Sequence, residues 1–216
     1  MKRFAVVLSG SGVFDGSEIH EATLSLLAIA QEGAHYDIFA PDINQHHVIN
    51  HLTGQEMNEK RNVLVESARI ARGKISPLSS FNAANFDALL FPGGFGAAKN
   101  LSSLAFDGSD CNVNREVVVA IKTMIQAKKP IGALCIAPAV IARVIDGVKV
   151  TIGLDEATAS DIEAMGGTHV ITNHGEVVED KVYRVFSTPC YMLDATIIDI
   201  FNGANNIVKA MMESMK

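Results

Sequence analysis

The stretch IGALCIAPAV, residues 131–140, places a cysteine at the junction between two predicted elements. Residues 130–134 form a short apolar run, which is typical of a strand buried in a parallel sheet. The alanine-rich apolar stretch that follows continues to Arg143, as expected of a helix. Pro138 falls in the first turn of that helix, where its missing N–H would have had no partner. Cys135 is therefore predicted to occupy the turn between strand and helix.

The residues around Cys135 are those that a nucleophile elbow requires. Ala133 and Ala137, two residues before and two after it, are both small, and the tight turn of an elbow crowds these flanking positions together. We expect a positive φ at Cys135 and a helix dipole that favours its thiolate. The alternative is that Cys135 is only a small buried hydrophobic residue. The pattern of small residues and proline favours an active cysteine.

Length and composition predict one folded α/β domain over residues 1–216. A chain of 216 residues is long enough for one sizeable domain and short for two. Hydrophobic residues make up 48% of it and charged residues 19%, which excludes a disordered chain. The net charge of -6, with scattered Lys and Arg, argues against nucleic acid or an anionic membrane as the main partner.

The cysteine content and the hydropathy pattern predict a soluble, cytoplasmic protein. Three cysteines are too few and too odd in number for a disulfide framework, and they suit a reducing compartment. The apolar run after the basic start is only residues 4–8, too short for an exported signal peptide. No apolar stretch approaches the roughly 20 residues of a membrane span.

The pattern of apolar runs and turns predicts a mostly parallel sheet with helices on both faces. In such sheets, ligands bind at the carboxyl ends of the strands. We expect strands at residues 4–8, 35–40, 87–91, 130–134 and 148–152 and a hairpin at 177–186. We expect helices at 17–32 (with Ser17 as N-cap), 61–72, 114–127 (with Asn114 as N-cap), 155–165 and 193–212.

Two further stretches could each form a binding site or have only a structural role. Gly10, Gly12 and Gly16 form G-x-G-x-x-x-G, one residue longer than the dinucleotide fingerprint, with Asp42 as the acidic partner. A sharp turn at the top of the sheet is the favoured interpretation. Histidines 46, 47 and 51 suggest a metal site, but no cysteines or spaced carboxylates accompany them, so a solvated insertion is favoured.

A glycine-rich segment, PGGFGAAKN at residues 92–100, directly follows the predicted strand 87–91. Glycines in this position leave backbone N–H groups accessible, as an oxyanion site requires. Gly93 and Gly94 are therefore candidates for that site, although a plain turn is the alternative. Lys99 either lends positive charge to the pocket or is a solvated side chain, and the second interpretation is favoured.

Several strings of the sequence resemble one known family. LSG at residues 8–10, VFDGSEIHE at 13–21, NHLTG at 50–54, PGGFGAAKNL at 92–101, CIAPA at 135–139 and Thr188-Pro189 are similar to the enhancing-lycopene-biosynthesis (ElbB) proteins. These belong to the ThiJ/PfpI superfamily of the class I glutamine amidotransferase-like fold. The resemblance spans nearly the whole chain.

The resemblance implies a flavodoxin-like three-layer sandwich and a cysteine nucleophile at Cys135. It also implies a glyoxalase-like activity on small dicarbonyl aldehydes, such as glyoxal and methylglyoxal, that needs neither glutathione nor a metal or organic cofactor. Members of the family often form homodimers. The family's name records a genetic link to isoprenoid production.

The sequence departs from related enzymes at the residues that would complete a catalytic set. Many superfamily members carry histidine directly after the cysteine, where this chain has Ile136. Glutamine amidotransferases use a late His-x-Glu, which His174 and Glu176 imitate in spacing, but these residues precede the hairpin. The loop that matches in topology begins at Thr188. His174 and Thr188 are thus candidate supporting residues only.

The resemblance also suggests the acid that works with Cys135. A glutamate of the first helix meets the cysteine in the superfamily, and Glu21, twelve residues before Gly33, matches its position. Glu18 lies one helical turn away and is the second candidate. Both acids could instead only complement the helix dipole. A carboxyl beside a thiolate would have a raised pKa, and the pair would titrate as a unit.

These residues predict a mechanism and leave one alternative open. Cys135 would add to the aldehyde, the N–H groups of Gly94 and Ile136 would hold the oxyanion, and Glu21 would move the protons. In the alternative, Cys135 is the oxidisable thiol of a redox-sensing or regulatory protein that is not an enzyme.

Overall fold

The computed structural model describes all residues from Met1 to Lys216. A seven-stranded sheet has the order β3-β2-β1-β4-β5-β9-β8, and a separate two-stranded sheet joins β6 and β7. The strands are β1 (Arg3–Val7), β2 (His35–Ala40), β3 (Ser76–Pro77), β4 (Ala88–Phe91), β5 (Ile131–Leu134), β6 (Lys149–Val150), β7 (Thr168–His169), β8 (Val178–Asp180) and β9 (Val185–Thr188). The helices are α1 (Ile19–Gln31), α2 (Val63–Ile70), α3 (Phe95–Lys99), α4 (Leu104–Asp107), α5 (Arg115–Gln126), α6 (Ala137–Val144), α7 (Glu156–Ala164) and α8 (Ile197–Ser214).

Every strand pair of the large sheet is parallel except β8 with β9. This confirms the predicted parallel sheet and the hairpin before the last strand. The centre of the sheet is apolar throughout because both of its faces are covered, as is usual for parallel sheets. The three-layer α/β fold expected from the sequence is therefore present.

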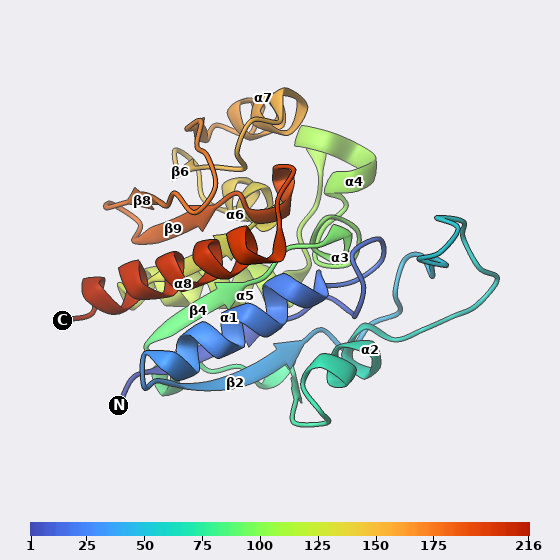
Figure 1. Cartoon of the computed structure of the whole chain (residues 1–216), viewed down its shortest axis with the longest axis horizontal. Coiled ribbons are helices and arrows are strands. Elements are labelled where there is room, and N and C mark those ends of the chain that lie inside the picture. Colours follow the sequence, from blue (N-terminus) through green and yellow to red (C-terminus); the bar gives the residue numbers. More distant parts are fainter.

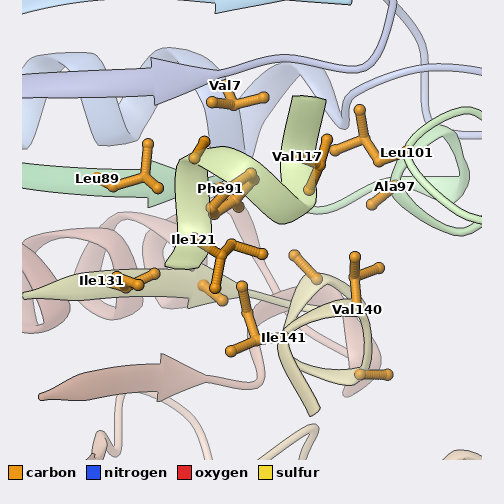
Figure 2. Packing of buried hydrophobic residues seen from close by; sticks show 14 of the residues in the cluster. Val7, Leu89, Phe91, Ala97, Leu101, Val117, Ile121, Ile131, Val140 and Ile141 are labelled. Carbon is orange, nitrogen blue, oxygen red and sulfur yellow. The ribbon is translucent and has the colours of Figure 1, made fainter. Parts of the chain in front are cut away.

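Side chains of β1 alternate between two hydrophobic cores, one on each face of the sheet. Phe4 and Val6 belong to the core under α1 and α8, which lie side by side in Figure 1. Ala5 and Val7 belong to the opposite core. Figure 2 shows that core, where side chains of β1, β4 and β5 meet those of α5 and α6.

The ends of several elements differ from the predictions for physical reasons. α1 begins at Ile19 with Glu18 as its N-cap, because the Ser17 hydroxyl instead accepts a hydrogen bond from the N–H of Ser9 at 2.8 Å. The apolar run 148–152 contributes only the two residues of β6, which pair with β7 outside the main sheet. The last helix begins at Ile197, where Thr196 forms a capping box with Asp199. α3 and α4 are short helices that the sequence did not predict.

Residues 43–60 contain no helix or strand and project from the body of the molecule, as the teal segment of Figure 1 shows. The segment is fixed at its base by Asp15, a buried residue whose carboxylate accepts a hydrogen bond from the N–H of Ile49 at 2.7 Å. No helix of the protein combines the length and apolar character needed to cross a membrane.

Candidate active site

Cys135 lies in the sharp turn between β5 and α6, and its φ of 59° confirms the predicted elbow. Pro138 occupies the first turn of α6, as expected. The N–H of Cys135 donates to the carbonyl of Thr188 at 3.0 Å, so β9 supports the elbow from the neighbouring strand. Thr188 thus contacts the nucleophile through its backbone, while its hydroxyl is buried without a hydrogen-bond partner.

Two backbone N–H groups are directed at the sulfur of Cys135. They belong to Gly94, at the start of α3, and to Ile136, at the start of α6. Gly94 has a φ of 96°, and a Cβ there would overlap the backbone of Gly16 and Glu18, so only glycine fits. The geometry therefore provides two donors beside the sulfur, which makes Gly94 and Ile136 candidates for an oxyanion site.

Glu21 is completely buried, and its carboxyl lies beside the Cys135 thiol, close enough that each group shifts the pKa of the other. One of its carboxyl oxygens accepts from the N–H of Gly93 at 3.0 Å, and the other accepts from the N–H of Tyr191 at 3.2 Å. The carboxyl is thereby held between the ends of β4 and β9, beside the nucleophile.

Glu18 is also buried but has a different role. Its carboxylate accepts a hydrogen bond from the N–H of Glu21 at 2.7 Å and caps α1. Its own N–H donates to the carbonyl of Gly93 at 2.9 Å. Glu18 therefore fixes the start of the helix, whereas the carboxyl that meets the sulfur is that of Glu21.

Gly93 allows these groups to come together. A side chain at this position would overlap Cβ of Cys135 and approach Oε2 of Glu21 to 2.6 Å. The absence of a side chain lets the end of β4 pass close to both Cys135 and Glu21. The sequence suggested Gly93 for its N–H, and the structure adds that it permits this close approach.

Burial dominates the electrostatics of the pair. Desolvation, reinforced by the negative charge of Glu18, raises the pKa of Glu21 to about 8, so the carboxyl is mostly neutral at pH 7. Desolvation and the nearby Glu21 also raise the pKa of the Cys135 thiol, although the N–H groups of Gly94 and Ile136 oppose this. The expectation that the start of the helix favours the Cys135 thiolate is thus wrong, because burial outweighs the effect of the N–H groups at the sulfur.

Tyr191 and His20 are site residues that the sequence did not reveal. Tyr191 holds Glu21 through its backbone, and its hydroxyl forms a hydrogen bond with Nδ1 of His20 at 2.8 Å. The sequence placed the loop after β9 at the same end of the sheet as the elbow, and this was the only indication that Tyr191 could reach the site. The contact with Glu21 joins residues 170 positions apart, so only the folded chain shows it.

A cavity of about 330 Å³ opens on Cys135. Six of its nine lining residues are hydrophobic, and they come from the loop before α1, from α3, from the elbow and from the loop after β9. A larger hollow of about 570 Å³ lies against the projecting segment 43–60, but its lining is polar and contains no part of the Cys135 site. The apolar cavity is the one that gives access to Cys135.

Two other predicted residues lie outside this cavity. His174 is exposed and lies near Asp199, in the first turn of α8. It does not approach Cys135, because the loop that carries it packs against α8. Lys99 is neither free in solvent nor directed at the sulfur, since its ammonium donates to the carbonyl of Phe14 at 2.9 Å and lies over the ring of Phe95.

The glycine loop does not form a phosphate cradle, because its N–H groups are used within the protein. Those of Gly10 and Gly12 donate to Ser67 and Ser17 at 2.9 Å each, and that of Gly16 donates to Gly12 at 2.7 Å. This outcome agrees with the favoured interpretation as a structural turn.

The three histidines of the projecting segment do not gather around a metal position. His46 and His47 pack against Phe106, whereas His51 accepts a hydrogen bond from the N–H of Phe14 at 3.2 Å. No group of three or more potential metal-ligating side chains occurs in the structure.

Comparison with known proteins identifies the family. Glutamine amidotransferase-like class 1 domain-containing protein 3, mitochondrial, from Homo sapiens is 48% identical over 221 residues, covering 98% of this chain and 82% of the human protein. The chain belongs to the glutamine amidotransferase-like class 1 family. The ES1 protein homolog, mitochondrial, from Rattus norvegicus is also 48% identical, covering 98% of this chain and 83% of its own. No protein-family model matches the chain.

Solved structures place the family in the ThiJ/PfpI fold. An isoprenoid biosynthesis protein with an amidotransferase-like domain from Ehrlichia chaffeensis is 39% identical, with a TM-score of 0.94 and 100% of both chains covered. DJ-1beta from Drosophila melanogaster, at 15% identity, has a TM-score of 0.54 over 99% of this chain and 95% of its own, and so shares the fold.

The two mammalian family members are mitochondrial by name, which contradicts the cytoplasmic location expected from the sequence. The expectation rested on three cysteines, all of them free in the structure. Unpaired thiols argue against an oxidising compartment but do not distinguish one reducing compartment from another.

Proposed function

We propose that the protein is a cysteine-dependent, glutathione-independent glyoxalase that converts small dicarbonyl aldehydes to hydroxy acids. The observation that carries the proposal is the contact between Cys135 and Glu21, a buried acid that is largely neutral at pH 7. A reaction that first protonates an oxyanion and then moves a proton between carbons needs one group that can serve as acid and then as base. Membership of a superfamily that includes enzymes supports the proposal.

The reaction begins when the sulfur of Cys135 adds to the aldehyde carbon. The pair is reactive when it holds a single proton: the Glu21 carboxylate accepts the proton of the Cys135 thiol, which leaves the thiolate beside neutral Glu21. The sulfur–carbon bond forms, the carbonyl electrons move to oxygen, and Glu21 gives its proton to that oxygen. The N–H groups of Gly94 and Ile136 stabilise the developing negative charge. The product of this step is a hemithioacetal.

Glu21, now a carboxylate, then removes the hydrogen from the former aldehyde carbon. The resulting enediol takes the proton back at the neighbouring carbon, so the hemithioacetal becomes a thioester of a hydroxy acid. Water hydrolyses the thioester and restores the Cys135 thiol. The net change adds one water to the dicarbonyl, with no external oxidant or reductant.

Burial of Cys135 favours this proposal over a peroxide sensor. Only 7% of the residue is exposed, whereas oxidation of a sensor cysteine by peroxide follows its exposure to solvent. The resemblance to the enhancing-lycopene-biosynthesis family and the name of the Ehrlichia chaffeensis protein support an association with isoprenoid metabolism.

The test is turnover of glyoxal and methylglyoxal by the purified protein without glutathione, measured as glycolate and lactate formed. We expect turnover by the natural protein and none by Cys135→Ser. Cys111→Ser is the matched control, because Cys111 is buried in the opposite core and should leave the rate unchanged. Equal rates for Cys135→Ser and the natural protein would exclude the cysteine mechanism.

A further inference from the structure

The cavity at Cys135 is larger than a two-carbon dicarbonyl requires. Its volume is about 330 Å³, within the range of roughly 300–1,000 Å³ seen for pockets that enclose much larger ligands. One water takes about 30 Å³ of liquid volume, so the cavity has space for on the order of ten atoms of that size. Glyoxal has four non-hydrogen atoms and would leave most of this space unfilled.

The walls of the cavity favour an apolar occupant. Val13, Phe95, Ile136 and Met192 line it, from four segments of the chain. Phe95 is 48% exposed and so presents an open aromatic surface. Each CH₂ group transferred from water to such walls contributes about 0.8 kcal/mol. A substrate with only two carbonyl groups would use none of this surface.

The charge in the cavity disfavours an anionic occupant. Asp155 is the only lining residue that is charged at neutral pH. The N–H of Thr158 donates to its carboxylate at 2.8 Å and lowers its pKa, so it stays ionised. No lysine, arginine or histidine lines the cavity, and the nearby Lys99 is held by the carbonyl of Phe14. An acid or phosphate group on the substrate would meet a negative charge and find no cation.

We propose that the substrate is an uncharged oxoaldehyde with an apolar alkyl or aryl substituent of several carbons. The inference rests on the proposed function, because it assigns the reacting carbonyl to Cys135. It adds that Val13 and Met192 hold the substituent and that Asp155 excludes carboxylate- or phosphate-bearing aldehydes.

The test compares kcat/KM for glyoxal, phenylglyoxal and 4-carboxyphenylglyoxal, each corrected for its rate of addition to a small thiol. One methylene in an apolar pocket typically changes kcat/KM about 10-fold or more. We therefore expect phenylglyoxal to exceed both other aldehydes by at least about 10-fold. Val13→Phe should reduce the rate with phenylglyoxal more than the rate with glyoxal. Asp155→Asn keeps a good N-cap residue for α7. It should reduce the ratio of kcat/KM for phenylglyoxal to kcat/KM for 4-carboxyphenylglyoxal.

A second measurement does not depend on turnover. Cys135 is alkylated with N-phenyliodoacetamide or with iodoacetate, and the modified peptide is quantified by mass spectrometry. Each alkylation rate is divided by the rate at which the reagent modifies free cysteine. We expect the corrected rate for N-phenyliodoacetamide to exceed that for iodoacetate by at least about 10-fold, and Asp155→Asn to reduce this ratio.

The outcomes separate the two proposals. Turnover with equal kcat/KM for the three aldehydes overturns the substrate inference and leaves the glyoxalase function intact. Absence of turnover with every aldehyde overturns the function, and the alkylation rates still decide the preference of the cavity. Equal corrected alkylation rates for the two reagents overturn that preference.

Discussion

At the scale of single residues, the proposed reaction depends on where the protons of Cys135 and Glu21 lie. Two backbone N–H groups hold the Glu21 carboxyl, and burial keeps it largely neutral at pH 7. Each member of the pair raises the cost of ionising the other, because their negative charges would share one desolvated space. The single-proton form that reacts therefore becomes more populated as the pH rises toward 8, and kcat/KM should rise with it.

Replacing Glu21 by glutamine should separate these electrostatic and catalytic effects. Glu21→Gln removes the negative charge that opposes ionisation of Cys135, so alkylation of Cys135 by iodoacetamide should begin at lower pH than in the natural protein. Turnover should fall by about 10²–10⁴-fold, because the proton carrier is lost. Peptide mass spectrometry across pH 6–10 gives the alkylation profile, and aldehyde turnover gives the rate.

Glu18→Gln is the control for this substitution, since its amide oxygen can still cap α1. It should alter both measurements far less than Glu21→Gln does. Full turnover in Glu21→Gln, together with loss of activity in Glu18→Gln, would show that Glu18 is the acid.

The residues of the site differ in how well the sequence predicts them. The position of Cys135 in an elbow is predicted from its neighbours in the sequence alone, because an elbow needs small flanking residues and a helix that starts directly after the cysteine. Glu21 was preferred to Glu18 through a family resemblance, and the structure places it at the sulfur. Tyr191 and Asp155 have no local signature, since they reach the site only when distant loops pack together. The raised pKa of Cys135 was missed because burial is a property of the folded chain.

At the scale of elements, the turn from β4 to α3 connects the oxyanion donors to the rest of the site. Its Gly93 contacts Glu21 and Glu18 by hydrogen bonds, and its Gly94 directs an N–H at Cys135. Two N–H groups at the start of α3 donate hydrogen bonds to the loop before α1. The acceptors are the carbonyls of Val13 and Gly16, each at 2.8 Å. α1 and α3 are therefore held in a fixed relation to the elbow.

Substitution of Gly94 should show how tightly this turn is built. Gly94→Ala would place a methyl group against the backbone of Gly16 and Glu18 and strain a φ of 96°. We expect a loss of about 3 kcal/mol or more in the free energy of unfolding. Gly54→Ala is the matched control, because Gly54 also has positive φ (71°) but open space around its Cβ position. It should cost about 1 kcal/mol.

Urea unfolding of the two alanine variants measures this difference. Equal destabilisation would mean that the positive φ alone, and not the close contact with α1, requires glycine at residue 94.

Element prediction succeeded where a pattern was complete within one segment. Asn114 was expected to cap α5, and its side chain accepts from the N–H of Glu116 and of Val117. The prediction of Ser17 as the cap of α1 failed because a distant strand end, at Ser9, takes its hydroxyl. The run 148–152 has the composition of a full strand, but only two of its residues find a partner strand.

At the scale of the whole molecule, the sheet brings the site together from both of its halves. Strands β4 and β9 flank β5, which leads into the elbow. The turns that follow β4 and β9 therefore meet beside the elbow, at the carboxyl ends of the parallel strands. Glu21 is attached to both turns by hydrogen bonds. The sequence predicted a parallel sheet, but the order of its strands, which decides which loops can meet, comes from the structure. Folding buries a titratable group where these loops meet.

That buried group should make global stability depend on pH. The pKa of Glu21 rises from 4.5 to about 8 on folding, so between these values the folded protein holds a proton that the unfolded chain releases. The stabilisation is fully present below about pH 4.5 and is lost as the pH rises through 8. The free energy of unfolding should therefore fall with rising pH in this window, by on the order of 1 kcal/mol per pH unit from this group.

Urea unfolding at pH 5, 6, 7 and 8 tests this, with Glu21→Gln as the reference protein. The amide does not titrate, so the other ionisable groups contribute almost equally to both proteins and cancel in the difference. We expect the natural protein to lose stability relative to Glu21→Gln as the pH rises. The window ends at pH 8, because cysteines of the unfolded chain titrate above it. Parallel pH curves for the two proteins would mean that Glu21 is ionised in the folded state, and the acid in the proposed mechanism would then lack its proton.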